Sequence, residues 1–301
     1  MIDGVLLVSH GTVENLDELE EFAVRIRRGR PAPPELVSEL RRRYEAIGGR
    51  SPLAATSAML ATKLEARLRV PVAWAGRHAP PFIRDTLIRL VEQGVSRVAV
   101  VPLAQHSAST YGGDALIAAR GLPLELVCSE NWGQEPGLSD AFARRIEVAL
   151  AGRQPVPATT LLFTAHSLPR FVIDAGDSYD SEVRASALAT WTRLAKYSAS
   201  LTYSLAFQSQ GLAGAGPGGP ASWLGPDLPT ALDAAQSRGD RMVVFAPIGF
   251  LADHVEVLYD LDIEARGLAV ARGLTYVRAS LPNADDDLVD VIAIVVSRLL
   301  K

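Results

Sequence analysis

The 301-residue chain is 48% hydrophobic and 21% charged, and its formal net charge is −4. This composition is typical of a globular protein, and the length predicts about two domains with buried cores. The acidic balance and the lack of a long Lys/Arg run argue against a nucleic-acid partner. Cys128 is the single cysteine, which excludes an internal disulfide and an iron–sulfur cluster held by the chain's own thiolates.

The same composition bears on location. No apolar stretch reaches the roughly 18 residues that a membrane span needs. The first residues, "MIDGVLLVSHG", carry an acidic side chain and only a short apolar run, which argues against a secretion signal. We therefore expect a cytoplasmic protein without a transmembrane segment.

In the first half of the chain, predicted strands and helices alternate. Apolar runs predict strands at 4–11, 70–76, 97–103 and 124–130. Amphipathic segments, one with proline near its start and glycine at its end, predict helices at 14–28, 33–49 and 81–94. This alternation indicates a parallel α/β sheet.

The second half repeats this scheme. "TTLLFTAHS" at 159–167 echoes the first strand, each being an apolar run broken by a histidine. Further strands are expected at 201–209 and 241–250, and helices at 226–239 and 285–301. We predict two similar Rossmann-like domains, each a parallel sheet flanked by helices, with a linker at 151–158 and a ligand cleft between them.

Three polar side chains fall at the carboxyl ends of predicted strands: His10, His166 and Gln208. Ligands of open parallel sheets bind beyond these ends. A neutral imidazole at His166 could ligate a metal ion or accept a proton near neutral pH. It could equally be a strand-end residue bonded to backbone, and on position alone both interpretations stay open.

Glu256, Asp260 and Glu264 recur every four residues in "ADHVEVLYDLDIEA". A regular α-helix would align the three carboxylates in one stripe, where like charges destabilise it by a few tenths of a kcal/mol per pair, about 0.2–0.5. Oxygen ligands suit hard or borderline divalent cations, so the stripe predicts a path for metal ions. The alternative is a solvated acidic face.

An arginine cluster follows the first predicted helix, at Arg27, Arg28 and Arg30. Guanidinium groups bind carboxylates through two hydrogen bonds each, and Arg43, Tyr44 and Ser51 could extend such a surface. The arginines could instead complement the negative end of a helix dipole.

Several long blocks, in this order, resemble the ferrochelatase family, whose members insert ferrous iron into porphyrins. They are "SHGTVENLDELEEFAVRIRRGR", "RRRYEAIGGRSPL", "TAHSLP" with "GDSYD", "FQSQG" with "WLGP", "PIGFLADHVEVLYDLDIEA" and "LPNADDDLVDVIA". The resemblance implies a lyase of haem biosynthesis. It also implies that the C-terminal helix returns to the first domain, which gives domains 1–152 with 284–301, and 153–283.

By position, the resemblance also implies roles. His166 matches the metal-binding, proton-handling histidine, and Glu256 matches a glutamate facing it across the macrocycle pocket. Asp260 and Glu264 match outer carboxylates that pass metal inward. The remaining matches are expected to bind the porphyrin: His10, Arg27, Arg28, Arg30, Arg43, Tyr44, Ser51, His78 and Trp223.

The compact N-terminal segment is most similar to the bacterial coproporphyrin branch of the family. That branch usually carries a tyrosine where His10 stands, so His10 is a candidate axial ligand to product iron. We expect coproporphyrin III and Fe²⁺ as substrates, no prosthetic group, and transient contact with another haem-pathway enzyme. Protoporphyrin IX is the alternative substrate, and a cobalt or nickel tetrapyrrole chelatase or a non-catalytic haem-binding protein are further alternatives.

Overall fold

The computed structural model describes residues 2–152, 158–197, 200–210, 215–216, 219–220 and 222–299. The described chain divides into two compact units. The first comprises Met1–Gly137, Leu251–His254 and Pro282–Lys301, and the second comprises Leu138–Phe250 and Val255–Leu281. The linker predicted at 151–158 lies mostly outside the described residues.

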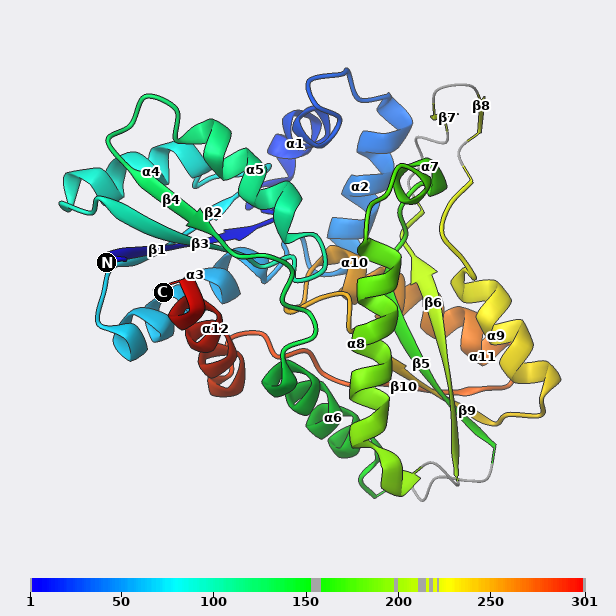
Figure 1. Cartoon of the computed structure of the whole chain (residues 1–301). Helices are drawn as coiled ribbons and strands as arrows, with labels where there is room; N and C mark the ends of the chain where they lie inside the picture. Colours follow the sequence, from blue (N-terminus) through cyan, green and yellow to red (C-terminus); the bar gives the residue numbers. More distant parts are fainter. Residues whose placement is uncertain are drawn as a thin grey trace. The chain divides into compact units, whose positions relative to one another are not determined.

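The first unit is built on a parallel sheet of strand order β2-β1-β3-β4 (Figure 1). Its strands are β1 (Gly4–Ser9), β2 (Val72–Gly76), β3 (Arg97–Pro102) and β4 (Glu125–Cys128). Strand β1 pairs on both sides and is buried along its whole length, which explains its unbroken apolar run.

Helices cover both faces of this sheet. In Figure 1, α4 (Ile83–Glu92) and α5 (Ala108–Ala118) lie on one face, and α3 (Leu53–Leu68) and α12 (Asp286–Leu299) lie on the other. The C-terminal helix α12 contacts α3 and β3. Three further helices follow β1: η1 (Leu16–Glu18), α1 (Leu19–Ile26) and α2 (Pro34–Ala46).

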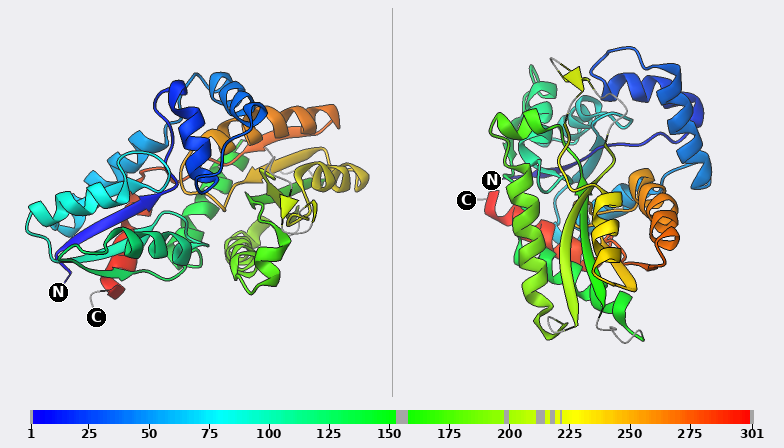
Figure 2. Two further views of the ribbon diagram at one scale, coloured as in Figure 1. Left: turned by 90° about the horizontal axis from the view of Figure 1, so that it is seen from above. Right: turned by 90° about the vertical axis from the view of Figure 1, so that its right-hand side faces the viewer.

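The second unit has a parallel sheet of strand order β10-β9-β5-β6. Its strands are β5 (Thr159–His166), β6 (Leu201–Gln208), β9 (Met242–Ala246) and β10 (Thr275–Arg278). The right-hand view of Figure 2 shows α8 (Tyr179–Arg193) on one side of these strands, with α9 (Leu228–Ser237) and α11 (Arg266–Ala271) on the other. The remaining elements are α6 (Pro136–Leu150), α7 (Arg170–Asp174), η2 (Ala195–Tyr197), α10 (Val255–Leu258), the π-helix η3 (Asp260–Ala265), and the two-residue strands β7 (Ala215–Gly216) and β8 (Gly219–Pro220).

The two sheets have the same topology. Counting strands in chain order within each unit, both sheets read second, first, third, fourth. The predicted α/β class with two similar parallel sheets is therefore confirmed. His10 directly follows the first strand of one unit, and His166 ends the first strand of the other.

Within the segment 14–28, which is predicted to be one helix, the α-helix itself begins only at Leu19. Asn15 accepts a hydrogen bond from the amide of Asp17 and caps the short 3₁₀ turn η1, after which α1 starts at Leu19. The asparagine side chain thus favours a tight local turn before the helix proper.

The loop after β9 packs closely against the end of β5. The amide of Gly249 donates to the carbonyl of Thr164 at 3.0 Å. A Cβ atom on Gly249 would lie 2.6 Å from both Cα and Cβ of Ala165, the residue before His166. Only glycine allows this approach, so Gly249 helps to set the backbone that presents His166.

We predict that Gly249→Ala destabilises the protein by about 1–3 kcal/mol, because the added methyl group must displace the backbone of β5. Gly267→Ala is the matched control, since a Cβ there meets nothing within 4 Å and the residue lies in α11. The control should be neutral or stabilising by about 0.5–1 kcal/mol. Urea denaturation measures both, and equal midpoints for the two variants would contradict the prediction.

Candidate active site

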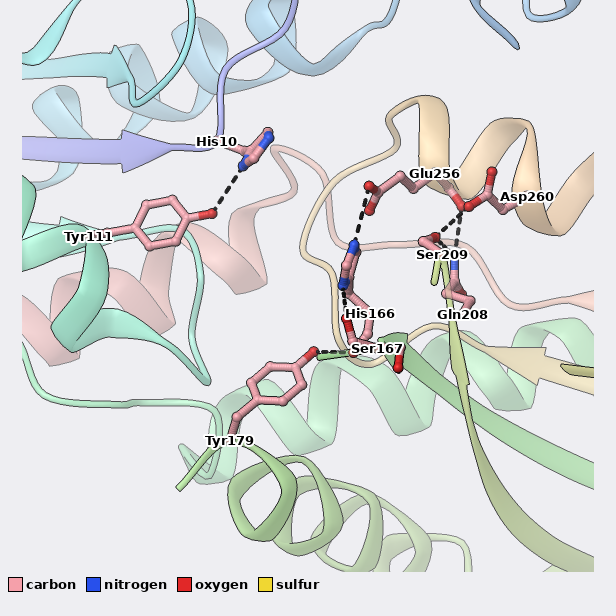
Figure 3. A network of polar contacts seen from close by, with 9 residues as sticks. All are labelled: His10, Tyr111, His166, Ser167, Tyr179, Gln208, Ser209, Glu256 and Asp260. Carbon is pink, nitrogen blue, oxygen red and sulfur yellow. Dashed lines mark hydrogen bonds and ion pairs between the residues drawn. The ribbon is translucent and has the colours of Figure 1, made fainter. Parts of the chain in front are cut away.

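Three hydrogen bonds fix the backbone at His166 and Ser167, and Figure 3 shows most of the residues involved. The hydroxyl of Tyr179 donates to the carbonyl of His166 at 2.9 Å. The amide of Ser167 donates to the carbonyl of Gln208 at 2.7 Å, and the hydroxyl of Ser167 donates to the carbonyl of Leu224 at 2.9 Å. The strand end is therefore held on both sides of the histidine.

These neighbours also orient the imidazole ring. Nδ1 of His166 lies within hydrogen-bond distance of the carbonyl of Ser167. A carbonyl only accepts, so Nδ1 carries the proton and donates it. Nε2 then points toward Glu256, with 3.5 Å between Nε2 and Oε1. The ring presents this second nitrogen as a base or a ligand, depending on its protonation.

Electrostatics favour the protonated ring. Burial opposes the charged form, but the Glu256 carboxylate, the Ser167 carbonyl and the Asp260 charge outweigh it and raise the pKa of His166. The side chains of His166 and Glu256 are 33% and 32% exposed, so a substrate can reach both. The pair can take up a proton and bind a cation at the same place.

The position of Glu256 differs from the expectation. The resemblance implied a glutamate across a pocket from the histidine, whereas the structure places the two side chains in contact within one unit. Glu256 lies in α10, directly after the loop that follows β9, and the carboxyl ends of β5 and β9 share a sheet edge. Their adjacency follows from this parallel topology.

The acidic stripe predicted on a regular α-helix is wrong in its geometry. Residues 260–265 form a π-helix, in which the amide of Glu264 donates to the carbonyl of Tyr259 at 3.0 Å. The wider turn separates the carboxylates: Asp260 is 2% exposed and accepts a hydrogen bond from Ser209, whereas Glu264 is exposed. π-Helical turns of this kind are frequent at functional sites.

Asp262, also in η3, belongs to a separate network. Its carboxylate accepts two hydrogen bonds from the guanidinium of Arg278, at 2.7 and 2.9 Å, and one from the hydroxyl of Tyr276 at 3.1 Å. This carboxylate pairs η3 with β10 and is not part of the contacts around His166.

In the first unit, His10 is an exposed imidazole surrounded by rings. Its Nδ1 lies 3.3 Å from the hydroxyl of Tyr111 (Figure 3), and its ring centroid lies 4.7 Å from that of His78 and 6.2 Å from that of Phe22. The guanidinium of Arg77 lies 4.9 Å from the centre of the Tyr111 ring. Burial and three nearby guanidinium groups lower the pKa of His78 to about 4, so this second histidine is neutral near pH 7.

The predicted arginine cluster follows α1. Arg27 donates to the carbonyl of Pro31 at 3.0 Å, which closes the turn. Arg28 adopts a left-handed backbone conformation, with φ of 57°, and both Arg28 and Arg30 are exposed. The exposed guanidinium groups are available to carboxylates in solution.

The other predicted porphyrin-binding residues are more enclosed. Arg43 forms an ion pair with Glu39 at 2.7 Å. Tyr44 is 1% exposed, and its hydroxyl lies 2.8 Å from the hydroxyl of Thr12. Ser51 is buried and accepts a hydrogen bond from the amide of Leu53 at the start of α3.

Trp223, the remaining predicted residue, is half-buried in the second unit. It forms a backbone bridge with Pro169, three residues after His166. Its neighbour Leu224 accepts the Ser167 hydrogen bond described above. The segment "WLGP" therefore supports the backbone that follows β5.

Within the described part of the chain, no group of three His, Cys, Asp or Glu side chains is arranged to hold a metal ion.

Over the same residues, no helix has the length and apolar character needed to cross a membrane.

Comparison with known proteins gives the family. The ferrochelatase family model matches residues 2–300. The chain belongs to the ferrochelatase family. The coproporphyrin III ferrochelatases of Halalkalibacterium halodurans and Bacillus subtilis are each 32% identical to it, over 99% of this chain and 97% of theirs. A protein named ferrochelatase from Herpetosiphon aurantiacus is 34% identical over 97% of both chains.

Solved structures show the same fold. SirB from Bacillus subtilis, determined with Fe³⁺, superposes with a TM-score of 0.60 over 99% of this chain and 96% of its own, at 15% identity. CbiX, the terminal enzyme of sirohaem biosynthesis in denitrifying bacteria, gives a TM-score of 0.51 over 99% of this chain and all of its own, at 17% identity. At these identities the likeness concerns architecture alone.

Several side chains that contact the candidate site have no role predicted from the sequence. Ser209 and Tyr179 lie in the blocks "FQSQG" and "GDSYD", and Gln208 was noted only for its position at a strand end. In the first unit, the hydroxyl of Tyr111 lies near Nδ1 of His10, and the guanidinium of Arg77 lies over the ring of Tyr111. The sequence indicates only that polar residues cluster within the family blocks. The hydrogen-bond partners of these residues lie far away in the sequence, so they depend on tertiary structure.

We predict that the first unit loses stability as the pH falls from about 6.5 to about 4. The pKa of His78 is lowered to about 4 and burial lowers that of His106 to about 3, against 6.5 for the unfolded histidines. Between these values the unfolded chain binds more protons, so the free energy of unfolding rises with pH in this window and falls on acidification.

Urea denaturation at several pH values tests this dependence. In His78→Gln the slope of the free energy of unfolding against pH should be smaller than in the wild type by up to about 1.4 kcal/mol per pH unit between pH 4 and 6.5. Above pH 7 the two slopes should coincide. An identical slope in variant and wild type throughout would contradict the neutral state of the half-buried His78 in the folded protein.

Proposed function

We propose that this protein is a ferrochelatase that inserts Fe²⁺ into coproporphyrin III. The observation that carries the proposal is the contact between His166 and Glu256, an imidazole and a carboxylate that lie 3.5 Å apart and remain about one-third exposed. Membership of the ferrochelatase family supports it. We likewise retain the cytoplasmic location and a transient haem-pathway partner as predictions.

The reaction requires proton transfer and metal binding at the same place. A free porphyrin carries two pyrrole N–H protons, and Fe²⁺ replaces both, so that two protons leave for each iron that enters. We assign His166 and Glu256 to this exchange: a carboxylate beside an imidazole accepts protons and favours an arriving cation. Iron is a substrate here.

The outer carboxylates suit a role in supplying iron. Glu264 is exposed and Asp260 is buried, with Asp260 held by Ser209 and lying close enough to affect the charge of His166. We infer that Fe²⁺ meets Glu264 first and Asp260 later, since carboxylate oxygens are suitable ligands for a borderline divalent ion. The same acidic field lowers the cost of bringing a cation to His166.

The planar porphyrin must bend for a metal ion to reach its nitrogens, and binding energy from remote groups can sustain that distortion. We assign the remote binding to the first unit, where Arg27, Arg28 and Arg30 follow α1. Coproporphyrin carries four propionates, twice as many as protoporphyrin, so a cluster of guanidinium groups favours the more acidic substrate. The names of the relatives from Halalkalibacterium and Bacillus support this choice.

The insertion assay is anaerobic incubation of the protein with Fe²⁺ and either porphyrin, followed by the absorbance of the metallated product. We expect faster turnover of coproporphyrin III. His166→Ala and Glu256→Gln should each lower kcat by about 10²-fold or more, the usual contribution of a positioned acid or base. Thr62→Ala on the surface of α3 is the control, with unchanged kcat expected.

Three outcomes would contradict parts of this proposal. Lack of insertion into either porphyrin would reject the enzyme and favour a haem-binding protein. Faster turnover of protoporphyrin IX would reject the substrate. Wild-type rates in both site variants would reject the assignment of His166 and Glu256.

A separate prediction concerns His10, which we propose as an axial ligand to product iron. Added coproheme should give the absorbance spectrum of a histidine-ligated haem, and His10→Ala should abolish this spectrum. Thr62→Ala, on the surface of α3 and outside the proposed site, is the control and should keep the histidine-ligated spectrum. A histidine-ligated spectrum that survives in His10→Ala would refute the role.

A further inference from the structure

The side chain of Gln208 joins the two halves of the candidate active site in the second unit. Gln208 ends β6 and is the direct register partner of His166 at the end of β5. Its Nε2 donates to the backbone carbonyl of Glu256 at 2.7 Å (Figure 3). One amide therefore connects the strand pair that carries the histidine with the helix that carries the glutamate.

The helix at the other end of this bond needs such support. Helix α10 comprises only Val255–Leu258, a single turn, and it is followed by the π-helix η3. A helical segment of this length is unstable by itself and takes its position from tertiary contacts. The Gln208 bond is a contact of that kind, made to the residue whose side chain meets His166.

The next residue continues the attachment. Ser209 has a left-handed backbone, with φ of 58°, and its hydroxyl donates to the buried carboxylate of Asp260. Left-handed conformations of non-glycine residues cost energy and cluster at functional sites. Gln208 and Ser209 thus hold consecutive turns of the segment that carries Glu256 and Asp260.

Packing alone does not explain a glutamine at this position. Gln208 is 2% exposed, and its Oε1 has no hydrogen-bond partner among the described residues. A buried acceptor without a partner costs about 1–3 kcal/mol. A methionine of similar length would fill the space without that oxygen, so what glutamine adds here is the bond of its amide nitrogen.

We propose that Gln208 is a positioning residue that sets the distance between Glu256 and His166 and thereby tunes the binding of Fe²⁺. The inference rests on the proposed function, because it concerns the same pair. Glu256 and His166 touch the substrates, and Gln208 acts through the backbone of Glu256. Residues that orient metal-binding side chains from behind typically contribute 10–100-fold to metal affinity or activity.

The test compares Gln208→Met with the wild type and with a matched control. Gln236→Met is the control, because the Nε2 of Gln236 makes the same kind of bond, to the carbonyl of Arg272 at 2.9 Å, on the exposed part of α9. In Gln208→Met we expect kcat/KM for Fe²⁺ to fall about 10–100-fold. We expect porphyrin affinity, measured by fluorescence quenching, to stay within about twofold of wild type, and the melting temperature to stay within a few degrees. The control should match the wild type in all three.

A second measurement does not depend on enzyme activity. Amide hydrogen exchange should become faster over 255–265 in Gln208→Met and stay unchanged over α9, since only the first segment loses its attachment. This result would stand even if the wild type inserted iron into no porphyrin, which would refute the proposed function instead.

Unchanged kinetics together with unchanged exchange in Gln208→Met would overturn the proposal. The proposal would also be overturned if porphyrin affinity fell as many-fold as kcat/KM for Fe²⁺ and the melting temperature dropped by more than a few degrees. Those losses together would identify Gln208 as a general structural residue. Gln208→Glu provides a further arm: it keeps the length of the side chain but places a carboxylate against the Glu256 carbonyl, and iron kinetics at wild-type level would equally refute the role.

Discussion

The parallel pairing of β5 with β6 and β9 is the constraint on which the rest of the site depends. Because the three strands run in the same direction, their carboxyl ends and the loops that follow lie at one edge of the sheet. His166 and Gln208 are register partners there, and the loop after β9 returns Gly249 against Ala165. The chain then enters α10 beside the histidine, which brings Glu256 to 3.5 Å from its ring.

The chemistry of the pair follows from its surroundings. A histidine enclosed by carboxylates is easier to protonate, and the same carboxylates attract a divalent cation. In the function that we propose, protons and Fe²⁺ compete for this place while iron replaces the pyrrole protons. The π-helix contributes by turning Asp260 inward toward Ser209 while leaving Glu264 in solvent, so the carboxylates differ in depth.

The strands that carry the two histidines could be predicted from the sequence, whereas the geometry of the acidic segment and the burial of Tyr44 and Ser51 could not. The apolar runs before His10 and His166 identified both first strands, since a strand paired on both sides is apolar throughout. The spacing of Glu256, Asp260 and Glu264 predicted a straight α-helical stripe, because a π-turn adds no recognisable sequence pattern. Tyr44 and Ser51 could only be expected on a ligand surface. Their burial depends on contacts with Thr12 and with the start of α3, which the local sequence does not contain.

The repeated topology places a histidine at the same point of both sheets. His10 and His166 occupy equivalent places after or at the end of the first strand of their sheets. The charges near them differ: three arginines lie near His78, whose ring neighbours His10, whereas the carboxylates of Glu256 and Asp260 lie near His166. The side chains on the following elements, and not the strands themselves, set this difference. The two units thus share a histidine position but differ in the charges around it, because the sheet edge fixes only where the histidine stands.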